Sequence, residues 1–171
     1  GDYAELMPLF TDEEIRQGGE IGNAYWALEG AYSQLTKNMN PRSQRNLLSN
    51  MILSADTAMT SPRKSVNLRF GHDGVVLPLV SLMEIGKYGK EFNEMDKFYE
   101  DYRVSDIIPM ACNVQMVFLR PTGSVNPNDV LVKVLLNEEE VTVGNLPTIA
   151  PGSPYYRWPA LRAFLSRKAE L

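Results

Sequence analysis

The sequence contains one cysteine and one histidine among its 171 residues, and both scarcities exclude classes of site. A single cysteine cannot close a disulfide within the chain, and it cannot supply the thiolates of a cysteine-based zinc site. The single histidine, His72, excludes chemistry that needs two histidines from this chain. We expect no metal and no cofactor, and we expect Cys112, in an apolar stretch, to be a reduced core residue.

Long apolar runs and basic runs are also missing. The longest apolar stretch, residues 75–83, is interrupted by Pro78 and is far shorter than the about 20 residues of a membrane span. The 17 Lys and Arg residues are scattered and are outnumbered by 21 Asp and Glu, which gives a formal net charge of −4. We therefore expect no membrane span and no nucleic-acid partner. A local anion pocket stays compatible with this charge, because a site depends on local charges.

What is present suits one globular domain, because a chain of this length can bury a real core. Thr11 and Glu14 have the spacing of a capping box at the start of a helix, which Gly18 and Gly19 would weaken or bend. Periodicity and turn residues predict helices at about 12–35, 43–59, 75–85 and 158–168, and strands at 65–70, 110–118, 130–136 and 140–143. Pro78 indicates that the regular part of the third helix starts near Leu77. The order is typical of an α/β chain whose sheet is covered by helices.

Chemistry concentrates at the junction between the first expected strand and the helix that follows it. His72 and Asp73 lie at the carboxyl end of that strand, where ligand sites gather in α/β sheets. Backbone N–H groups at the start of the helix favour an anion such as phosphate. His72 can donate hydrogen bonds to phosphate oxygens, and Asp73, kept protonated by burial and a nearby anion, can give a proton to a leaving oxygen.

A structural interpretation of the same residues stays open. In it, Gly71 and Gly74 serve a tight turn, Asp73 caps the helix, and His72 is a half-buried histidine with its hydrogen bonds satisfied. Arg69 lies on the polar side of the expected strand; it can face a phosphate pocket, and a structural salt bridge is the alternative that we favour.

Residues 68–82, from Leu-Arg-Phe-Gly-His-Asp-Gly onward, resemble a segment of the multiple inositol-polyphosphate phosphatases, in the acid-phosphatase and phytase branch of the histidine phosphatases. The helix with Tyr25-Trp26, residues 107–113 and residues 130–137 agree with this family in order and rough spacing. The resemblance implies that residues 1–171 are a single domain or fragment. It would be the C-terminal portion of a three-layer, phosphoglycerate-mutase-like catalytic domain with a mixed sheet covered by helices.

The resemblance also implies a mechanism through a phosphohistidine intermediate. By motif matching, His72 takes the role of the second, phosphate-binding histidine, and Asp73 that of the acid that protonates the leaving alcohol. Gly74 and Arg69 are expected beside the substrate. Many inositol-polyphosphate members have His-Ala-Glu where this chain has His-Asp-Gly, a difference that bears on substrate preference more than on reaction type.

The family's nucleophilic histidine, in an Arg-His-Gly motif, has no counterpart here, because Arg69 and Gly71 flank a phenylalanine. We therefore expect no turnover from this chain alone. The expected partners are a phosphorylated small molecule, the N-terminal part of the same protein and, through an exposed strand edge, a second copy. The resemblance implies export to a periplasmic, secreted or lumenal setting. The alternatives are a non-catalytic phosphate-binding or interaction module, and an unrelated α/β domain in which His72 and Asp73 only shape a turn.

Overall fold

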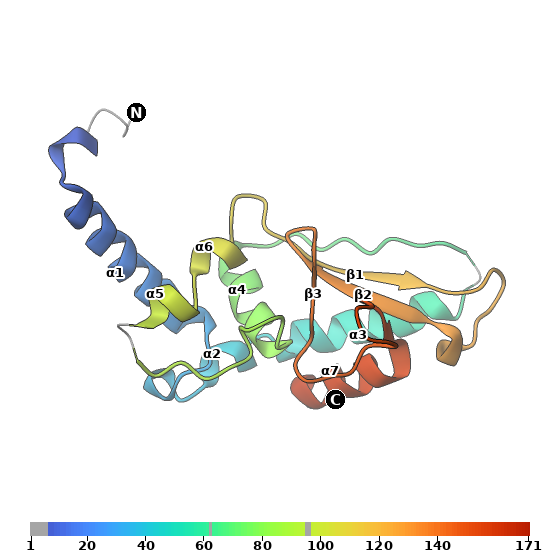
Figure 1. Cartoon of the computed structure of the whole chain (residues 1–171). Coiled ribbons are helices and arrows are strands. Elements are labelled where there is room, and N and C mark those ends of the chain that lie inside the picture. Colours follow the sequence, from blue (N-terminus) through green and yellow to red (C-terminus); the bar gives the residue numbers. More distant parts are fainter. Residues whose placement is uncertain (1–6, 62, 95–96) are drawn as a thin grey trace.

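A small antiparallel sheet with two helices packed below it forms one end of the molecule (Figure 1). The computed structural model describes residues 7–61, 63–94 and 97–171. The strands predicted at 110–118 and 130–136 form an antiparallel hairpin that pairs from Val114↔Leu136 to Leu119↔Leu131. The sheet order is β1-β2-β3, with β4 also paired to β2, and its strands are β1 Val114–Leu119, β2 Leu131–Leu136, β3 Glu139–Val141 and β4 Tyr156–Arg157.

Two helices cover the lower face of the sheet in this view, α3 Arg45–Met59 and α7 Trp158–Ala169. Both were predicted from their apolar spacing, and each buries one stripe. The carboxylate of Asp56 on α3 accepts hydrogen bonds from Arg162 on α7, at 2.9 and 3.0 Å from Nε and 2.8 Å from Nη2. The same carboxylate accepts a 3.3 Å bond from the Trp158 indole, so the two helices are tied by charge as well as by packing.

A second group of helices surrounds α4 Asp73–Leu82, which is buried from residue 77 to its end. The group consists of α1 Asp12–Gly30, α2 Met39–Arg42, α5 Phe98–Asp101 and α6 Val104–Ile107; short 3-10 turns lie at Met7–Leu9, Gln34–Thr36 and Pro127–Asp129. The buried Asn23 of α1 donates to the carbonyl of Tyr102 (3.0 Å) and accepts from the amide of Val104 (2.8 Å), which ties α1 to the α5–α6 segment.

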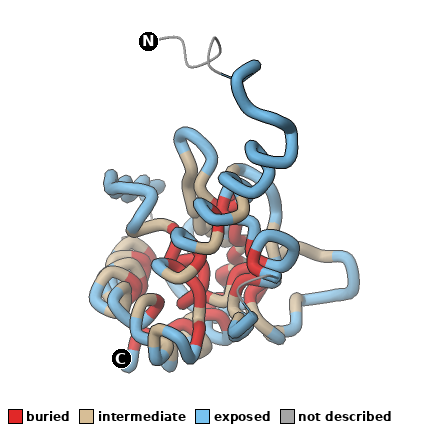
Figure 2. Tube along the Cα trace, turned by 90° about the vertical axis from the view of Figure 1, so that its left-hand side faces the viewer, coloured by how far each residue is buried: buried red, intermediate tan, exposed pale blue. Residues whose placement is uncertain are grey.

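The first half of α1 projects from the body of the molecule, and Figure 2 shows it as exposed. Its predicted capping box is confirmed, because the Thr11 side chain accepts from the Glu14 amide and the Glu14 carboxylate accepts from the Thr11 amide. The helix continues through Gly18 and Gly19 and ends at Gly30, earlier than the predicted residue 35. It ends where Gly30 packs closely on Leu77 of α4.

The structure overturns two predictions around residue 70. Residues 64–72 are extended but form no strand, because no described part of the chain offers them a hydrogen-bonding neighbour. The alternation of apolar and polar residues predicts an extended segment, but a β-strand also needs a neighbouring strand to which its backbone can hydrogen-bond. The next helix begins at Asp73 rather than near Leu77. Pro78 lies inside this helix, and its missing N–H removes one hydrogen bond to a carbonyl in the exposed first turn.

The expected α/β class is confirmed, since helices pack against a sheet, but the sheet is antiparallel rather than mixed in the described residues. Within the described residues every named strand pair is antiparallel. The strand predicted at 110–118 begins only at Val114. A turn at Asn137 and Glu138, both with positive φ, leads into β3, which overlaps the strand predicted at 140–143. The polar stretch of residues 87–106 contains α5 and α6.

The α1–α4 contact gives a stability test. A methyl group added at Gly30 would overlap Cγ of Leu77, whereas one added at Gly22 meets no atom within 4 Å. We expect Gly30→Ala to lower the free energy of unfolding by about 1–3 kcal/mol, because it overpacks the interface. Gly22→Ala, in the exposed part of the same helix, should instead raise it by up to about 1 kcal/mol. Urea unfolding followed by circular dichroism measures both, and equal effects would contradict the close approach.

Candidate functional site

His72 and Asp73 lie together at the point where the extended segment enters α4 (Figure 1). His72 is the N-cap residue, with extended backbone, and Asp73 is the first helical residue. The His72 carbonyl accepts from the amides of Val75 (2.9 Å) and Val76 (3.3 Å). The amide of Gly74 donates to Oδ1 of Asp73 at 2.8 Å. All three predicted residues, His72, Asp73 and Gly74, are therefore adjacent, and all three are exposed.

This placement contradicts the structural interpretation in both of its main points. Asp73 is not the N-cap, and His72, which is, makes no side-chain capping bond. His72 is exposed rather than half-buried, and its ring has no hydrogen-bond partner within the described residues. Asp73 is also exposed, so the described residues do not supply the burial that we expected around its carboxyl group.

Arg69 points away from this pair and onto α3. Its guanidinium donates to Oδ1 of Asn50 (2.7 Å from Nη2, 3.3 Å from Nε) and to Oγ of Ser54 (2.7 Å). The prediction of a salt bridge at Arg69 is wrong for the described residues, because Asn50 and Ser54 are both uncharged. The bonds fasten the extended segment to α3, and the contact of Arg69 with a substrate stays a prediction.

The loop that precedes β1 lies close to Asp73. Burial raises the pKa of the Cys112 thiol, and the negative charge of Asp73 raises it further. Cys112 is half-buried rather than part of the core, so the core expectation is wrong. The residues that the resemblance aligned separately, 68–74 and 107–113, therefore meet at one end of α4.

The extended segment also exposes an apolar edge, formed by Val66, Leu68 and Phe70. These side chains are 81%, 72% and 94% exposed, respectively. Large apolar side chains that follow one another along an unpaired segment are typical of a surface that another element covers.

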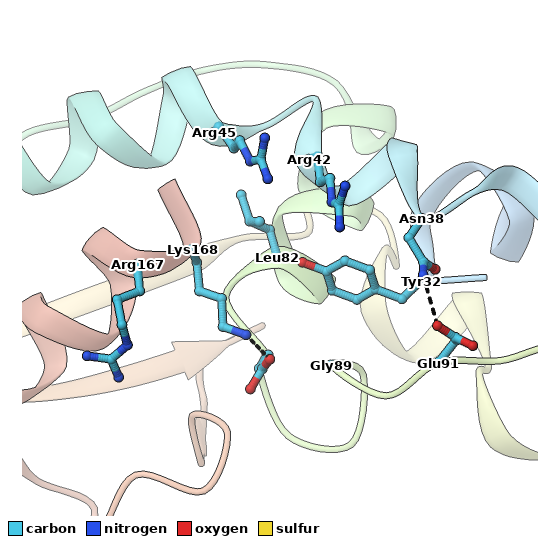
Figure 3. A pocket seen from close by; sticks show the side chains of 10 residues that line it. Tyr32, Asn38, Arg42, Arg45, Leu82, Gly89, Glu91, Arg167 and Lys168 are labelled. Atoms are coloured by element: carbon cyan, nitrogen blue, oxygen red, sulfur yellow. Dashed lines mark hydrogen bonds and ion pairs between the residues drawn. The ribbon is translucent and has the colours of Figure 1, made fainter. Parts of the chain in front are cut away.

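Two cavities lie away from His72 and Asp73. One, of about 460 Å³, is lined by residues of α3 and by Ser61, Arg63, Ser65 and Asn67. The other, of about 360 Å³, is lined by basic side chains near the far end of α4 (Figure 3). Sequence reasoning missed both, because their linings come from segments far apart in the chain. No group of three or more His, Cys, Asp or Glu residues in the described ranges is placed to hold a metal ion, and no helix there is long and apolar enough to cross a membrane.

No protein-family model matches the sequence. Solved structures do match, and among them are three structures of the Bifidobacterium longum multiple inositol polyphosphate phosphatase. The phosphate complex superposes with a TM-score of 0.72 over 86% of this chain at 21% identity. The apo form gives 0.69 over 81% at 21% identity, and the inositol hexasulfate complex 0.63 over 74% at 22% identity.

The chain shares the fold of part of this phosphatase. It covers only 26–31% of the length of those chains. The resemblance found in the sequence is thus confirmed at the level of fold.

The electrostatic influence of Asp73 on Cys112 can be tested with a thiol reagent. Because burial and the Asp73 charge both raise the thiol pKa, the thiolate fraction at pH 8 is small and alkylation should be slow. Asp73→Asn removes the charge, lowers the thiol pKa and should speed the reaction of iodoacetamide. The chain has one cysteine, so mass spectrometry follows one site. Glu29→Gln, an exposed charge on α1, is the control; equal rates in both variants would contradict the proximity.

Proposed function

We propose that this chain is the acid-bearing part of a phosphomonoesterase of the histidine acid phosphatase type. Its substrates would be inositol polyphosphates, such as phytate, or related phosphorylated alcohols. The observation that carries the proposal is the exposed pair His72 and Asp73 at the start of α4, a helix that is buried from residue 77 onward. The fold supports it, since the matching structures are of an inositol polyphosphate phosphatase.

The proposed chemistry divides the work between two polypeptide segments. His72 and Gly74 bind phosphate oxygens near the positive end of the α4 dipole. A histidine outside this chain attacks phosphorus, the bond from phosphorus to the ester oxygen breaks, and Asp73 gives its proton to that oxygen. Asp73, now a carboxylate, then takes a proton from the water that hydrolyses the phosphohistidine. Each residue returns to its starting state, and alcohol and phosphate leave.

The unpaired segment supports the need for a second polypeptide part. Residues 64–72 have no strand partner in the described ranges, and their apolar edge is exposed. The matching chains are more than three times as long as the part that this chain covers. We propose that the remaining part pairs with this segment and supplies the nucleophilic histidine. An exported setting is proposed on the resemblance alone.

One observation favours a second candidate, a non-catalytic module that binds phosphate. His72 is the only histidine of the chain, so the chain itself offers no nucleophile once His72 binds phosphate. An Arg-His-Gly-x-Arg motif upstream in the natural reading frame would favour the enzyme, and its absence there would favour the module.

Activity assays on the natural full-length gene product separate these candidates. With phytate and with a simple phosphate ester, we expect Asp73→Asn to lower kcat by about a hundred- to ten-thousand-fold, because the leaving alcohol loses its acid. Glu29→Gln is the control, and residues 1–171 alone should release no phosphate. Wild-type kcat in Asp73→Asn, or turnover by residues 1–171 that Asp73→Asn abolishes, would overturn the assignment.

The apolar edge predicts self-association of residues 1–171 in isolation. We expect Leu68→Lys with Phe70→Lys to lower the mass measured by light scattering from that of an oligomer to that of the monomer, because charge opposes edge pairing. Leu35→Lys, at an exposed leucine elsewhere, should leave the mass unchanged. A monodisperse wild-type monomer at high concentration would contradict this expectation.

A further inference from the structure

The cavity of about 360 Å³ lies at the opposite end of α4 from His72 and Asp73 (Figure 3). Four basic and two acidic side chains line it, together with Tyr32, Asn38, Leu82 and Gly89; the charged ones are Arg42, Arg45, Arg167, Lys168, Glu84 and Glu91. The lining therefore carries two positive charges in excess, in a chain whose formal charge is −4. Figure 3 shows Arg42, Arg45 and the Tyr32 ring around a shared space above Leu82.

The basic groups that face this space have donors to spare. Arg42 makes no hydrogen bond or ion pair with any residue that the structure describes. Arg45 pairs with the exposed carboxylate of Glu170, yet its Nε is buried and without a partner. An unpaired buried donor is costly, and a ligand oxygen would satisfy it. Arg167 contributes less, because its guanidinium lies over the Phe164 ring, 5.8 Å from the centroid.

The Tyr32 hydroxyl adds a neutral donor. Burial raises its pKa, as does the charge of Glu84, while Arg42 and Arg45 act in the opposite direction. The net effect raises the pKa of Tyr32, so its hydroxyl stays protonated at neutral pH.

The two carboxylates of the lining bond to groups other than Arg42 and Arg45. Glu84 pairs with Lys168. Glu91 accepts from the side-chain amides of Asn93 (2.8 Å), Asn38 (2.8 Å) and Gln34 (2.9 Å), and these bonds lower its pKa. Asn38 itself keeps a buried Oδ1 without a partner, an acceptor that suits a hydroxyl group.

Glu84, in the wall of the cavity, has a strained backbone conformation. It has a φ of 55° at the left-handed position that ends α4, where glycine is usual; the amide of Ile85 bonds to Val80 and that of Glu84 to Ser81. A non-glycine residue at this position has a strained backbone. A methyl group added at Gly89 would overlap Cβ of Glu84, and one added at Gly144 would lie 2.7 Å from its Oε2. Close packing of two glycines on a strained charged residue is typical of a functional position.

We propose that this cavity is a binding site for the phosphate group of a small phosphorylated molecule, held by Arg42, Arg45 and the Tyr32 hydroxyl. Guanidinium groups bind phosphate oxygens through paired N–H donors. Two guanidinium groups and a hydroxyl offer more donors than the two oxygens of a carboxylate need, so they suit a phosphate better. The volume is near the lower end of ligand pockets, about 300–1,000 Å³, which leaves room for a small organic group beside the phosphate. The site is separated from His72 and Asp73 by the 10 residues of α4, about 15 Å, and does not rest on the proposed phosphatase function.

The test is a titration with inorganic phosphate in chloride buffer, followed by calorimetry and by amide NMR shifts. We expect shifts in residues 38–45 and 165–169, and an affinity at least tenfold lower in Arg42→Gln and in Arg45→Gln. Arg63→Gln is the matched control, because Arg63 is an exposed arginine in the lining of the other cavity. Arg42 is exposed and unpartnered, so Arg42→Gln should fold normally, which near-ultraviolet circular dichroism checks.

The same experiment distinguishes the two ends of α4. Shifts confined to residues 71–76, with affinity lost in His72→Asn and unchanged in Arg42→Gln, would overturn the cavity site while leaving the phosphatase proposal standing. Glycerol 3-phosphate is titrated in parallel to separate free phosphate from an organic phosphate. Tighter binding than inorganic phosphate, sensitive to Arg42→Gln, supports the proposal; failure of the ester to bind overturns the assignment to phosphorylated molecules.

Discussion

The burial of α4 is the constraint on which the rest of the structure depends. Leu77, Val80 and Leu82 are fully enclosed by the helices around α4, and a fully buried side chain of this kind contributes about 1.5–3 kcal/mol. Because this helix cannot shift without opening the core, both of its ends are fixed. One end holds His72 and Asp73 at the surface, and the other holds Glu84 in the wall of the basic cavity. Two candidate sites of different chemistry are thus positioned by one packed element.

Local patterns predicted the parts of the fold whose causes are local. The capping box at Thr11 needs only a hydroxyl and a carboxylate at the right spacing, and the hairpin of β1 and β2 needs two alternating runs and a turn. The prediction of a strand at residues 65–70 is wrong because strand pairing is not a local property. Alternation fixes which side chains share a face, but pairing depends on a neighbour from elsewhere, and none of the described residues takes that place. The prediction that the helix starts near Leu77, made from Pro78, is wrong for a related reason: the packing around α4 outweighs the loss of one hydrogen bond.

The two candidate sites differ in how far the sequence reveals them. His72, Asp73 and Gly74 are consecutive, so a sequence motif alone could identify them. The cavity combines Tyr32, Arg42, Arg45 and Lys168, which the fold brings together from both ends of the chain. No spacing rule connects such residues, and the sequence could establish only that a negative net charge permits a local basic site.

Residues 64–72 are attached to the rest of the chain at several points, and this attachment affects how readily another strand could pair with them. The segment is held at one end by α3 and at the other by α4, and in its middle Arg69 bonds to Asn50 and Ser54. Fixing a free residue into an extended conformation costs about 1–2 kcal/mol in entropy. In residues 64–72, much of this entropy cost is already met when the chain itself folds. An incoming strand would therefore meet a preorganised template, and its docking would be limited by collision and alignment rather than by a search among backbone conformations.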